Sequence, residues 1–437
     1  MTIISPVFII FVLAVLILYY FLPRRAQNIL LLAASYGFLV VWGWAYALVF
    51  ALLTAANYIL ARRLAGTHSS QRMVLWAGIG INLAALAYFK HADFFIPYVV
   101  YYLKRIDIVL DAPTLIFLLP LGLSFYVVQA IAYLMDVRRG LVDPPGDVVD
   151  FALYMVYFPR LIAGPIERGR NLLPQLSARR VVDNQVLRRA FTLILVGLVR
   201  KVVIADSLLQ LLPEEIFNNP SAYMAPDLGI WLAVYGVVLY NDFAGYTSLV
   251  RGVSELFGIQ LSPNFATPYF ARSFSEFWQR WHITLSDWLR DYIFTPLTRT
   301  LLRGGMNSRH PATLILPPLA TMLVSGFWHG ATQGMLLWGA LHALFQIGER
   351  LINRYYKVKP AAKRPVWRQA AGGLVIFTLV TLAWVPFRMA LPQAFDYWLG
   401  LFDPAGWQAG WSALSLPVGV YVLCLLLTTI SLGVDYA

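Results

Sequence analysis

The 437-residue chain has few charged residues and a single cysteine. Asp, Glu, Lys and Arg together make up 13% of it, whereas 59% is hydrophobic, and the mean hydropathy is +0.65. Soluble globular domains carry about 25% charged residues, so the composition excludes that class and indicates an integral membrane protein. The one cysteine, Cys424, lies in an apolar run. An internal disulfide and a cysteine-based metal cluster are therefore excluded, and a packing role is expected.

Apolar segments of membrane-spanning length recur along the chain. A transmembrane helix needs about 20 predominantly apolar residues. The sequence predicts an all-α polytopic membrane protein with about 11 such helices. No low-complexity linker or soluble domain interrupts them, so one integral domain over residues 1–437 is expected. The predicted spans are 4–23, 27–43, 45–61, 73–89, 113–135, 186–211, 226–250, 312–328, 330–350, 367–388 and 411–433.

Basic residues gather in the short loops between these spans and account for the net charge of +12. Such loops orient membrane proteins, so we interpret the charge as a topology signal and expect no nucleic-acid partner. Arginine pairs at 24–25, 62–63 and 138–139 follow the first, third and fifth spans. All three pairs are cytoplasmic if the N-terminus is extracytoplasmic, which is the predicted orientation. The first span lacks a basic n-region and a cleavage site, so it is expected to remain as an anchor.

Two stretches break the pattern of long spans. In residues 149–185, Pro and Gly interrupt an apolar segment too short to cross a bilayer, which predicts a re-entrant or cavity-lining segment. In residues 277–292, a 100° helical period predicts one interfacial amphipathic helix. His282 falls at the edge between its two faces, where it would touch both protein and water. The apolar face holds Trp278, Trp281, Leu285, Trp288, Leu289 and Tyr292, and the polar half holds Arg280, Asp287, Arg290 and Asp291.

The chain has six histidines, and their surroundings differ. His68, His91 and His310 have polar or charged neighbours in loops, so solvated positions are expected. His329 joins two apolar segments, where an ionisable group usually faces a cavity or a partner. A functional role and a neutral imidazole bonded to a backbone carbonyl explain this position equally well. His342, thirteen residues further on, is expected to serve packing or hydrogen bonding.

The neighbourhood of His329 narrows the chemistry that it could perform. No HxxxH or HExxH motif or nearby carboxylate surrounds it, so no metal site is expected. The sequence contains no GxSxG motif, so a serine hydrolase is not expected. An imidazole has an ordinary pKa of about 6.5 and suits removal of a hydroxyl proton as general base. A transporter with an ion-coupling histidine is a second hypothesis, although no paired broken helices are found, and a scaffold without chemistry is a third.

Three other polar positions have more than one interpretation. Asn241 and Asp242 could be ligands or acid–base groups, and a helix cap before a Gly-containing turn explains them equally well. Glu167 is expected to pair with Arg168 or Arg170 at the surface.

Five ordered blocks of sequence carry a more specific signal. They are PLGLSFYVVQAIAYLMDVRRG (120–140), FPRLIAGPIERGR (158–170), DFAGYTSLVRGVSELFGIQLSPNFATPYF (242–270), FWQRWHITLSDWLRDYIFTPL (277–297) and SGFWHGATQGMLLWGALHALF (325–345). Together they resemble the membrane-bound O-acyltransferase family, in particular its bacterial alginate O-acetylation proteins and the D-alanyl transfer proteins of the teichoic acid pathway. The resemblance implies a bacterial cytoplasmic (inner) membrane protein, with spanning, re-entrant and interfacial helices around a central tunnel.

The resemblance also implies roles for individual residues. His329 matches the family's catalytic histidine, and His282 matches the second histidine, of the WH block. His282 would orient the thioester or assist protonation of the leaving thiolate. The tryptophans and the tyrosine below are candidate tunnel-wall residues, although packing explains them equally well. Arg290 and Asp291 would hold the cytoplasmic entrance or simply pair with each other. The candidate substrate-binding residues are Trp281, Trp328, Tyr246, Asn241, Arg290 and Asp291.

The implied reaction is O-acyl transfer without a bound cofactor. The donor would be a cytoplasmic thioester, either acetyl-CoA or a phosphopantetheine-linked acyl carrier protein, and His329 would accept the proton of a hydroxyl acceptor arriving from the opposite face. FPRLIAGPIERG and WVPFR (384–388) favour acetylation of a cell-envelope or exopolysaccharide, through a periplasmic partner acetyltransferase. Two departures from alginate-type members, PLTRTLLRGG (296–305) in place of PLGGNR and Ser248 in place of Asp, keep D-alanyl transfer as the alternative.

Overall fold

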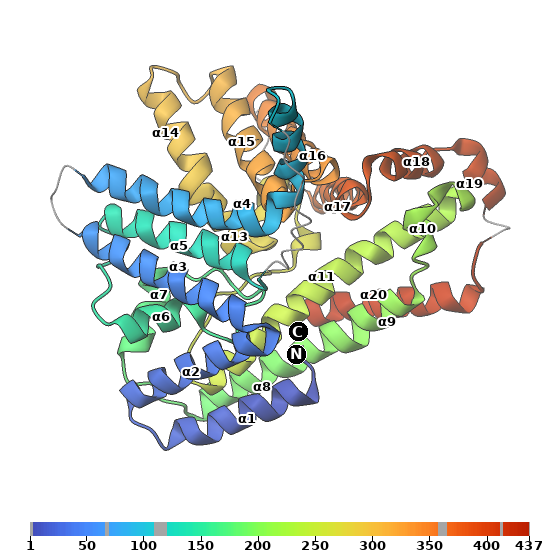
Figure 1. Cartoon of the computed structure of the whole chain (residues 1–437). Helices are drawn as coiled ribbons and strands as arrows, with labels where there is room; N and C mark the ends of the chain where they lie inside the picture. The colour runs from blue at the N-terminus through green and yellow to red at the C-terminus, as the bar shows by residue number, and fades with distance from the viewer. Residues whose placement is uncertain (1–2, 66–69, 109–119, 357–364, 411–413, 437) are drawn as a thin grey trace. The chain divides into compact units, whose positions relative to one another are not determined.

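The computed structural model describes the chain apart from a few short stretches, and every described element is a helix, with no strand among them (Figure 1). This confirms the all-α prediction. By contacts the chain forms two compact units: unit 1 is Met1–Gly197 with Tyr246–Pro263, and unit 2 is Leu198–Gly245 with Asn264–Ala437. The expected single domain stays a prediction. The described residues are 3–65, 70–108, 120–356, 365–410 and 414–436.

Unit 1 contains most of the N-terminal helices. Its first helix begins where Ser5 accepts a hydrogen bond from the Phe8 amide and Pro6 takes the first helical position. Before α5, Gly122 has φ +84°, and a Cβ there would lie 2.0 Å from the Leu161 carbonyl oxygen, so only glycine fits. The helices are α1 (Pro6–Tyr20), α2 (Arg24–Trp42), α3 (Trp44–Arg63), α4 (Gln71–Lys104), α5 (Leu123–Arg138), α6 (Val148–Val156), α7 (Gly169–Ser177), most of α8 (Asn184–Leu198) and the end of α11 (Ala225–Leu256).

Unit 2 contains the rest of α11 and the C-terminal helices, around a core of buried aromatic residues that includes Trp231, Trp338 and Trp384. Two segments, η1 and η4, are π-helical, and two more, η2 and η3, are 3₁₀ turns. The elements are η1 (Val199–Asp206), α9 (Ser207–Leu211), α10 (Glu215–Asn218), η2 (Pro220–Ala222), η3 (Pro268–Phe270), α12 (Phe274–Arg280), α13 (Ile283–Leu289), η4 (Arg290–Phe294), α14 (Thr295–Arg303), α15 (Pro311–His329), α16 (Gln333–Tyr356), α17 (Val366–Arg388), α18 (Leu391–Leu401), α19 (Pro404–Gly410) and α20 (Val418–Tyr436).

Helices α15 and α16 form a tight hairpin in unit 2. A Cβ on Gly326 would lie 2.4 Å from the Met335 carbonyl oxygen, and one on Gly339 would lie 2.5 Å from that of Met322. Glycines of this kind let two helix backbones approach closely, as is common where helices pack in membranes. The hairpin fixes the end of α15, which is His329.

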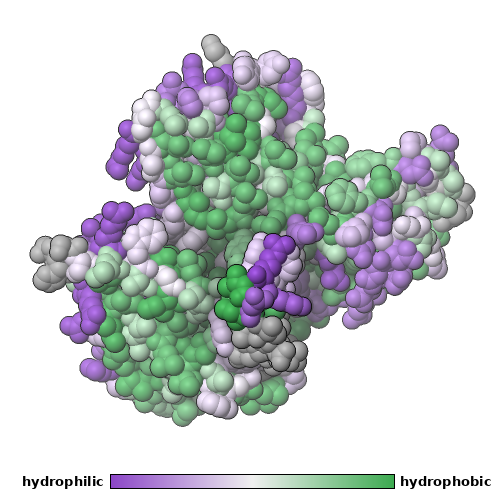
Figure 2. All heavy atoms as spheres, turned by 45° about the horizontal axis from the view of Figure 1, so that its top comes forward, coloured by the Kyte–Doolittle hydropathy of each residue, from purple (hydrophilic) through white to green (hydrophobic). Residues whose placement is uncertain are grey.

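Each predicted span overlaps at least one helix within the described residues. Six described helices are long and apolar enough to cross a membrane, and α1 is a shorter apolar helix of 15 residues. Large apolar side chains such as Ile10, Leu374 and Leu425 are exposed on the outside of their helices, and Figure 2 shows broad hydrophobic areas on the surface. Parts of two predicted spans, 113–119 and 411–413, lie outside the described residues. The qualifying segments are Trp44–Arg63, Gln71–Ala92, Ala225–Leu256, Pro311–His329, Val366–Arg388 and Val418–Asp435.

The predicted interruption at 149–185 is confirmed as a break in the helices. Two short helices, α6 and α7, are joined by residues 157–168, which are not helical and are almost wholly buried within unit 1. Irregular backbone in such a place must find its hydrogen-bond partners inside the protein.

The prediction of one continuous helix over 277–292 is wrong. The helix breaks after Arg280, and His282 takes a left-handed conformation with φ +42° before α13 begins. The segment 264–266 accounts for the break, because the Ile283 amide donates to the Asn264 carbonyl oxygen at 2.8 Å and the Ala266 amide to that of Arg280 at 3.0 Å. Tertiary hydrogen bonds thus override a helical pattern that contains no Pro or Gly. The residues of its predicted apolar face are nevertheless buried or half-buried.

Candidate active site

His329 is the last residue of α15, and aromatic rings surround it within unit 2. Its ring lies 4.8 Å from that of Trp328, 5.3 Å from that of Trp338 and 5.3 Å from that of Phe387, each time in an edge-on arrangement. The side chain is half-buried. An imidazole in this place combines an apolar, water-poor surrounding with some access from outside, which suits a group that exchanges a proton with a bound substrate.

His282 contacts the same tryptophan, Trp328. Its ring centre is 6.2 Å from that of Trp328 and 4.9 Å from that of Phe243. The side chain is only 2% exposed, so the prediction that it touches water is wrong. The fold buries it because the left-handed turn after Trp281 directs this residue into the core of unit 2. The structure therefore brings the two predicted catalytic histidines to a shared ring, Trp328.

The two tryptophans predicted to line the site are both buried in unit 2. Trp328 contacts both His282 and His329. Trp281 stacks on Phe277 with ring centres 5.6 Å apart and lies 5.1 Å from Trp384. Trp384 in turn lies 5.4 Å from Phe387, which contacts His329. An unbroken series of rings thus connects Trp281 to His329.

His342 packs behind this site. It is 0% exposed, and its ring lies 4.8 Å from that of Trp338 and 5.1 Å from that of Trp278. Within the described part of the chain, neither of its ring nitrogens has a hydrogen-bond partner. Of the two expected roles, packing is therefore the one confirmed.

The interpretation of Asn241 and Asp242 as helix caps is wrong, because both lie inside α11. Asn241 donates to the Val237 carbonyl oxygen at 2.9 Å and to Ser431 Oγ at 2.8 Å, which ties α11 to α20. Asp242 accepts a 2.6 Å bond from Lys201. These contacts explain both side chains structurally, and the substrate-binding role of Asn241 stays a prediction.

Arg290 and Asp291 pair with each other, as one of their two interpretations predicted. Arg290 Nε lies 3.0 Å from Asp291, and its Nη1 lies 2.6 Å from Asp287. Burial acts to lower the pKa of Arg290, but the two carboxylates outweigh this effect and raise the pKa above its usual value. Arg290 also lines a small cavity of about 170 Å³, together with Trp278 and Ser286.

Tyr246 belongs to unit 1, so its place in the wall of the histidine site stays a prediction. The surface pairing expected for Glu167 is wrong. Its side chain is buried and accepts hydrogen bonds from the Ser262 amide at 2.5 Å and from Ser262 Oγ at 3.1 Å, within unit 1. The carboxylate thus anchors the turn at 262 rather than an arginine.

The predicted solvated positions of the three remaining histidines have three different outcomes. His310 is exposed as predicted, and its Nδ1 accepts a bond from the Ala312 amide at the start of α15. His91 is buried in α4, so its predicted solvated position is wrong. His68 lies outside the described residues. Cys424 is buried among apolar neighbours, which confirms its packing role.

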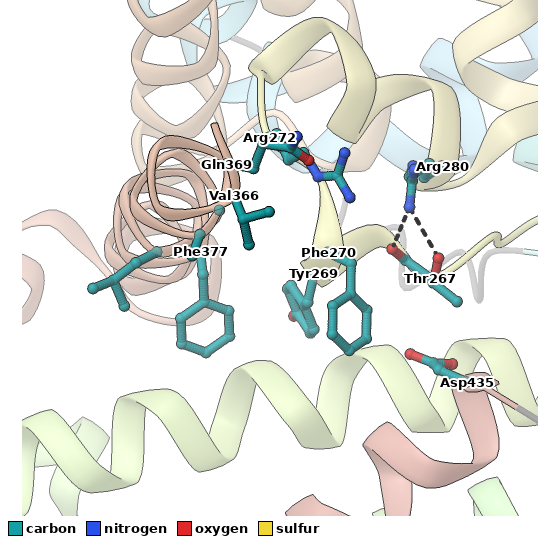
Figure 3. A pocket seen from close by; sticks show the side chains of 12 residues that line it. Thr267, Tyr269, Phe270, Arg272, Arg280, Val366, Gln369, Phe377 and Asp435 are labelled. Carbon is teal, nitrogen blue, oxygen red and sulfur yellow. Dashed lines mark hydrogen bonds between the residues drawn. The ribbon is translucent and has the colours of Figure 1, made fainter. Parts of the chain in front are cut away.

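Unit 2 also contains a pocket that the sequence did not indicate. Its volume is about 670 Å³, within the usual range for small-molecule sites. Its lining includes Arg272, Arg280 and Gln369 (Figure 3). Arg280 had been assigned only to a polar helix face, and the other two belong to segments without a recognisable motif. Within the described residues, no three His, Cys, Asp or Glu side chains gather as metal ligands.

Known proteins with similar sequences include several acyltransferases. The chain is 36% identical over 399 residues to the probable alginate O-acetylase AlgI of Azotobacter vinelandii, covering 89% of this chain and 75% of that protein. It is 30% identical over 422 residues to the peptidoglycan O-acetyltransferase of Helicobacter pylori, covering 88% and 76%. It is 29% identical over 283 residues to the teichoic acid D-alanyltransferase of Streptococcus thermophilus, covering 61% and 68%.

A family model points in the same direction. The model of the membrane-bound O-acyltransferase family (MBOAT) matches residues 145–389, more than half of the chain. The matched segment contains both His282 and His329 and the tryptophan between them. The chain therefore belongs to the membrane-bound O-acyltransferase family and is a multi-pass, all-helical O-acyltransferase.

Proposed function

We propose that this enzyme takes an acetyl group from a cytoplasmic thioester and transfers it across the membrane to a hydroxyl acceptor, for O-acetylation of a cell-envelope or exopolysaccharide. One observation carries the proposal: His329 is half-buried at the end of α15, with aromatic rings on several sides, whereas His282 and His342 are fully buried. Of these three histidines, His329 is the one best able to meet a substrate. Two relatives named as acetylating enzymes, each matched over most of the chain, support acetyl as the acyl group.

In this mechanism His329 acts as general base. The hydroxyl oxygen of the acceptor attacks the thioester carbonyl carbon while the imidazole takes the hydroxyl proton. The new carbon–oxygen bond forms, the carbon–sulfur bond breaks, and the thiolate leaves with the proton returned by the imidazolium. The rings of Trp328, Trp338 and Phe387 limit water around the reacting carbonyl, which disfavours hydrolysis of the thioester. No bound cofactor takes part.

His282 acts in the proposal by position rather than by proton exchange with solvent. Its ring is buried and contacts Trp328, the ring that also contacts His329. We infer that it orients the thioester or assists protonation of the leaving thiolate, and that Trp281 and Trp328 form part of the wall around the reacting groups. Tyr246, Asn241, Arg290 and Asp291 remain proposed substrate contacts.

The proposed direction of transfer rests on the distribution of basic residues. Residues 350–368, which run from the last turns of α16 to the first turn of α17, contain seven Lys or Arg and no Asp or Glu. Such a segment favours the cytoplasmic side, and the arginine pairs at 24–25, 62–63 and 138–139 favour the same side for an extracytoplasmic N-terminus. The protein would then lie in the bacterial cytoplasmic membrane and pass its acetyl group to a periplasmic acetyltransferase partner or directly to the glycan.

The test follows loss of thioester by the purified protein in lipid. Radiolabelled acetyl-CoA and, separately, a D-alanyl-loaded carrier protein are supplied to the wild type, to His329→Ala and to the control variant His310→Ala, whose histidine is exposed. We expect acetyl-CoA consumption that requires His329 and is unaffected at His310. Full activity of His329→Ala would rule out the general base.

D-alanyl transfer to teichoic acid is the second candidate, and the Streptococcus thermophilus relative supports it. In the same assay, turnover restricted to the loaded carrier protein would select this candidate. The shorter match to that relative, 61% of the chain against 89% for the Azotobacter vinelandii relative, is the reason that acetyl transfer is preferred.

A further inference from the structure

Unit 1 contains a pocket of its own, with a volume of about 590 Å³. It lies between residues 140–147, which lead from α5 into α6, and helix α7. This volume is within the usual range for small-molecule sites, and the lining contains charges of both signs. The polar and charged side chains of the lining are Asp143, Asp147, Asp150, Arg170 and Ser177.

The pocket lies close to the charged end of a membrane-spanning helix. Helix α3 is long and apolar enough to cross a membrane, and its last turn holds Arg62 and Arg63. One turn before Arg62, the Tyr58 hydroxyl donates to the carbonyl oxygen of Gly146 at 3.4 Å, and Gly146 lines the pocket. Tyrosine and arginine at the end of a span mark the boundary between hydrocarbon and water. The pocket therefore lies at the level of the lipid headgroups.

Two of the three carboxylates in the lining already have partners. Asp150 accepts hydrogen bonds from Arg24 at 3.2 Å and from Asn28 at 2.7 Å. Asp147 accepts from two amides in the first turn of α6, at 2.7 and 3.2 Å, and lies 3.7 Å from Arg25. These contacts hold the walls of the pocket together, and both carboxylates are explained by them.

The other two charges of the lining have opposite signs and are free to meet a ligand. The side chains of Asp143 and Arg170 are exposed, and neither makes a hydrogen bond or an ion pair with any described residue, the other included. A carboxylate accepts hydrogen bonds from an ammonium group, and a guanidinium binds a phosphate through two parallel hydrogen bonds. Leu141, an apolar residue of the lining, is also exposed. The pocket thus suits a zwitterion with a phosphate, an ammonium group and an apolar part.

We propose that this pocket binds a phospholipid headgroup with a phosphate and a primary ammonium, that of phosphatidylethanolamine. Arg170 contacts the phosphate, Asp143 contacts the ammonium, and the acyl chains leave the pocket over Leu141. The position at the headgroup level favours a phospholipid over a soluble zwitterion. Ethanolamine is preferred to choline because a quaternary ammonium has no N–H to donate. The inference goes beyond the proposed function and does not depend on it.

The experiment uses native mass spectrometry of the full-length protein in detergent. It measures the affinities for phosphatidylethanolamine, phosphatidylcholine and phosphatidylglycerol with identical acyl chains, and we expect phosphatidylethanolamine to bind most tightly. Arg170→Gln should weaken the binding of phosphatidylethanolamine and phosphatidylcholine alike, by about 10-fold, the loss expected for one charge-assisted hydrogen bond. Asp143→Asn should weaken phosphatidylethanolamine binding by a similar factor and abolish its preference over phosphatidylcholine. The controls Arg179→Gln and Asp396→Asn change exposed, non-lining positions and should have no effect.

A third variant blocks the pocket without removing a charge. Nothing lies within 4 Å of a Cβ at Gly146, so the side chain of Gly146→Trp can enter the pocket, and lipid binding should be lost. Equal affinities for the three lipids, or phosphatidylethanolamine binding unchanged in both Arg170→Gln and Asp143→Asn, would overturn the proposal. Glycerophosphoethanolamine, which lacks acyl chains, separates the two sources of the headgroup. If it bound as tightly as the lipid, the pocket would belong to a soluble zwitterion and the lipid assignment would be rejected.

Discussion

Two buried polar arrangements, one in each unit, are built on opposite principles. In unit 1, Asn57 of α3 and Asn82 of α4 form a closed pair in which each amide donates to the other, at 3.1 and 2.8 Å. Each also donates to a carbonyl of its own helix. In unit 2, His342 is equally buried, yet within the described residues both of its ring nitrogens are without partners.

The two arrangements differ in whether the buried polar atoms have hydrogen-bond partners inside the protein. Leaving a buried polar atom unpaired costs free energy, so a saturated pair is explained by structure alone. In unit 2, aromatic rings surround His329 and His342, and the two ring nitrogens of His342 have no partner among the described residues. Substitutions in unit 1 should therefore change stability, and those at His329 should change catalysis.

The largest effect is expected from His329→Ala. Removal of a general base typically lowers kcat about 10²- to 10⁴-fold, and the thermal midpoint should change little because the side chain is only half-buried. Single-turnover transfer from acetyl-CoA and a thermal melt of the same sample test both statements. A melt lowered as strongly as the rate would show that His329 acts through the fold, and the contrast between the two regions would be lost.

Gly326→Leu should have the next largest effect, this time on stability. The new side chain would collide with the Met335 carbonyl of α16, and overpacking a close helix contact typically costs about 1–3 kcal/mol. Gly348→Leu in the same hairpin is the control, because nothing lies within 4 Å of a Cβ at that position. Detergent-induced unfolding of both variants measures the difference. Equal unfolding midpoints would mean that the α15–α16 contact is looser than described.

A smaller loss of unfolding free energy is expected from Asn57→Leu, since this substitution leaves the Asn82 amide with one hydrogen bond fewer. Hydrogen bonds between membrane helices contribute about 0.6 kcal/mol on average and up to roughly 1.7 kcal/mol. The double variant Asn57→Leu/Asn82→Leu removes both polar groups and should recover part of the loss. The unfolding free energies of the two single variants and the double variant form a cycle. Additive losses would show that the pair is not coupled.

The sequence predicted the elements of this fold better than the partners of its side chains. Long apolar runs and their loops place the helices, because a span of about 20 apolar residues has one stable form in lipid. The turn at His282 could not be predicted, because it depends on hydrogen bonds from residues 264–266 rather than on local propensity. The five ordered blocks singled out His329 and His282 through resemblance and not through spacing, and the catalytic roles of both histidines stay predictions.

The local sequence also failed to predict which single polar residues are buried. Glu167 and His91 both have charged or polar sequence neighbours, which suggested the surface, yet both are buried. The partner of Glu167, Ser262, lies 95 residues away in the chain. Nor does any motif in the sequence predict the pocket that Arg272 lines. Contacts and cavities of this kind arise only when distant segments meet.

The smallest effect on stability is expected from His342→Phe. This variant tests the buried group without hydrogen-bond partners in the comparison. Phenylalanine keeps an aromatic ring beside Trp338 and Trp278 and removes two nitrogens that have no partner among the described residues. Replacing an unsatisfied polar group by an apolar one of similar shape is close to neutral or stabilising. The unfolding free energy should therefore stay within about 1 kcal/mol of the wild type, and transfer should continue. A marked loss of kcat without a loss of stability would instead make His342 a positioning residue for His329 through Trp338.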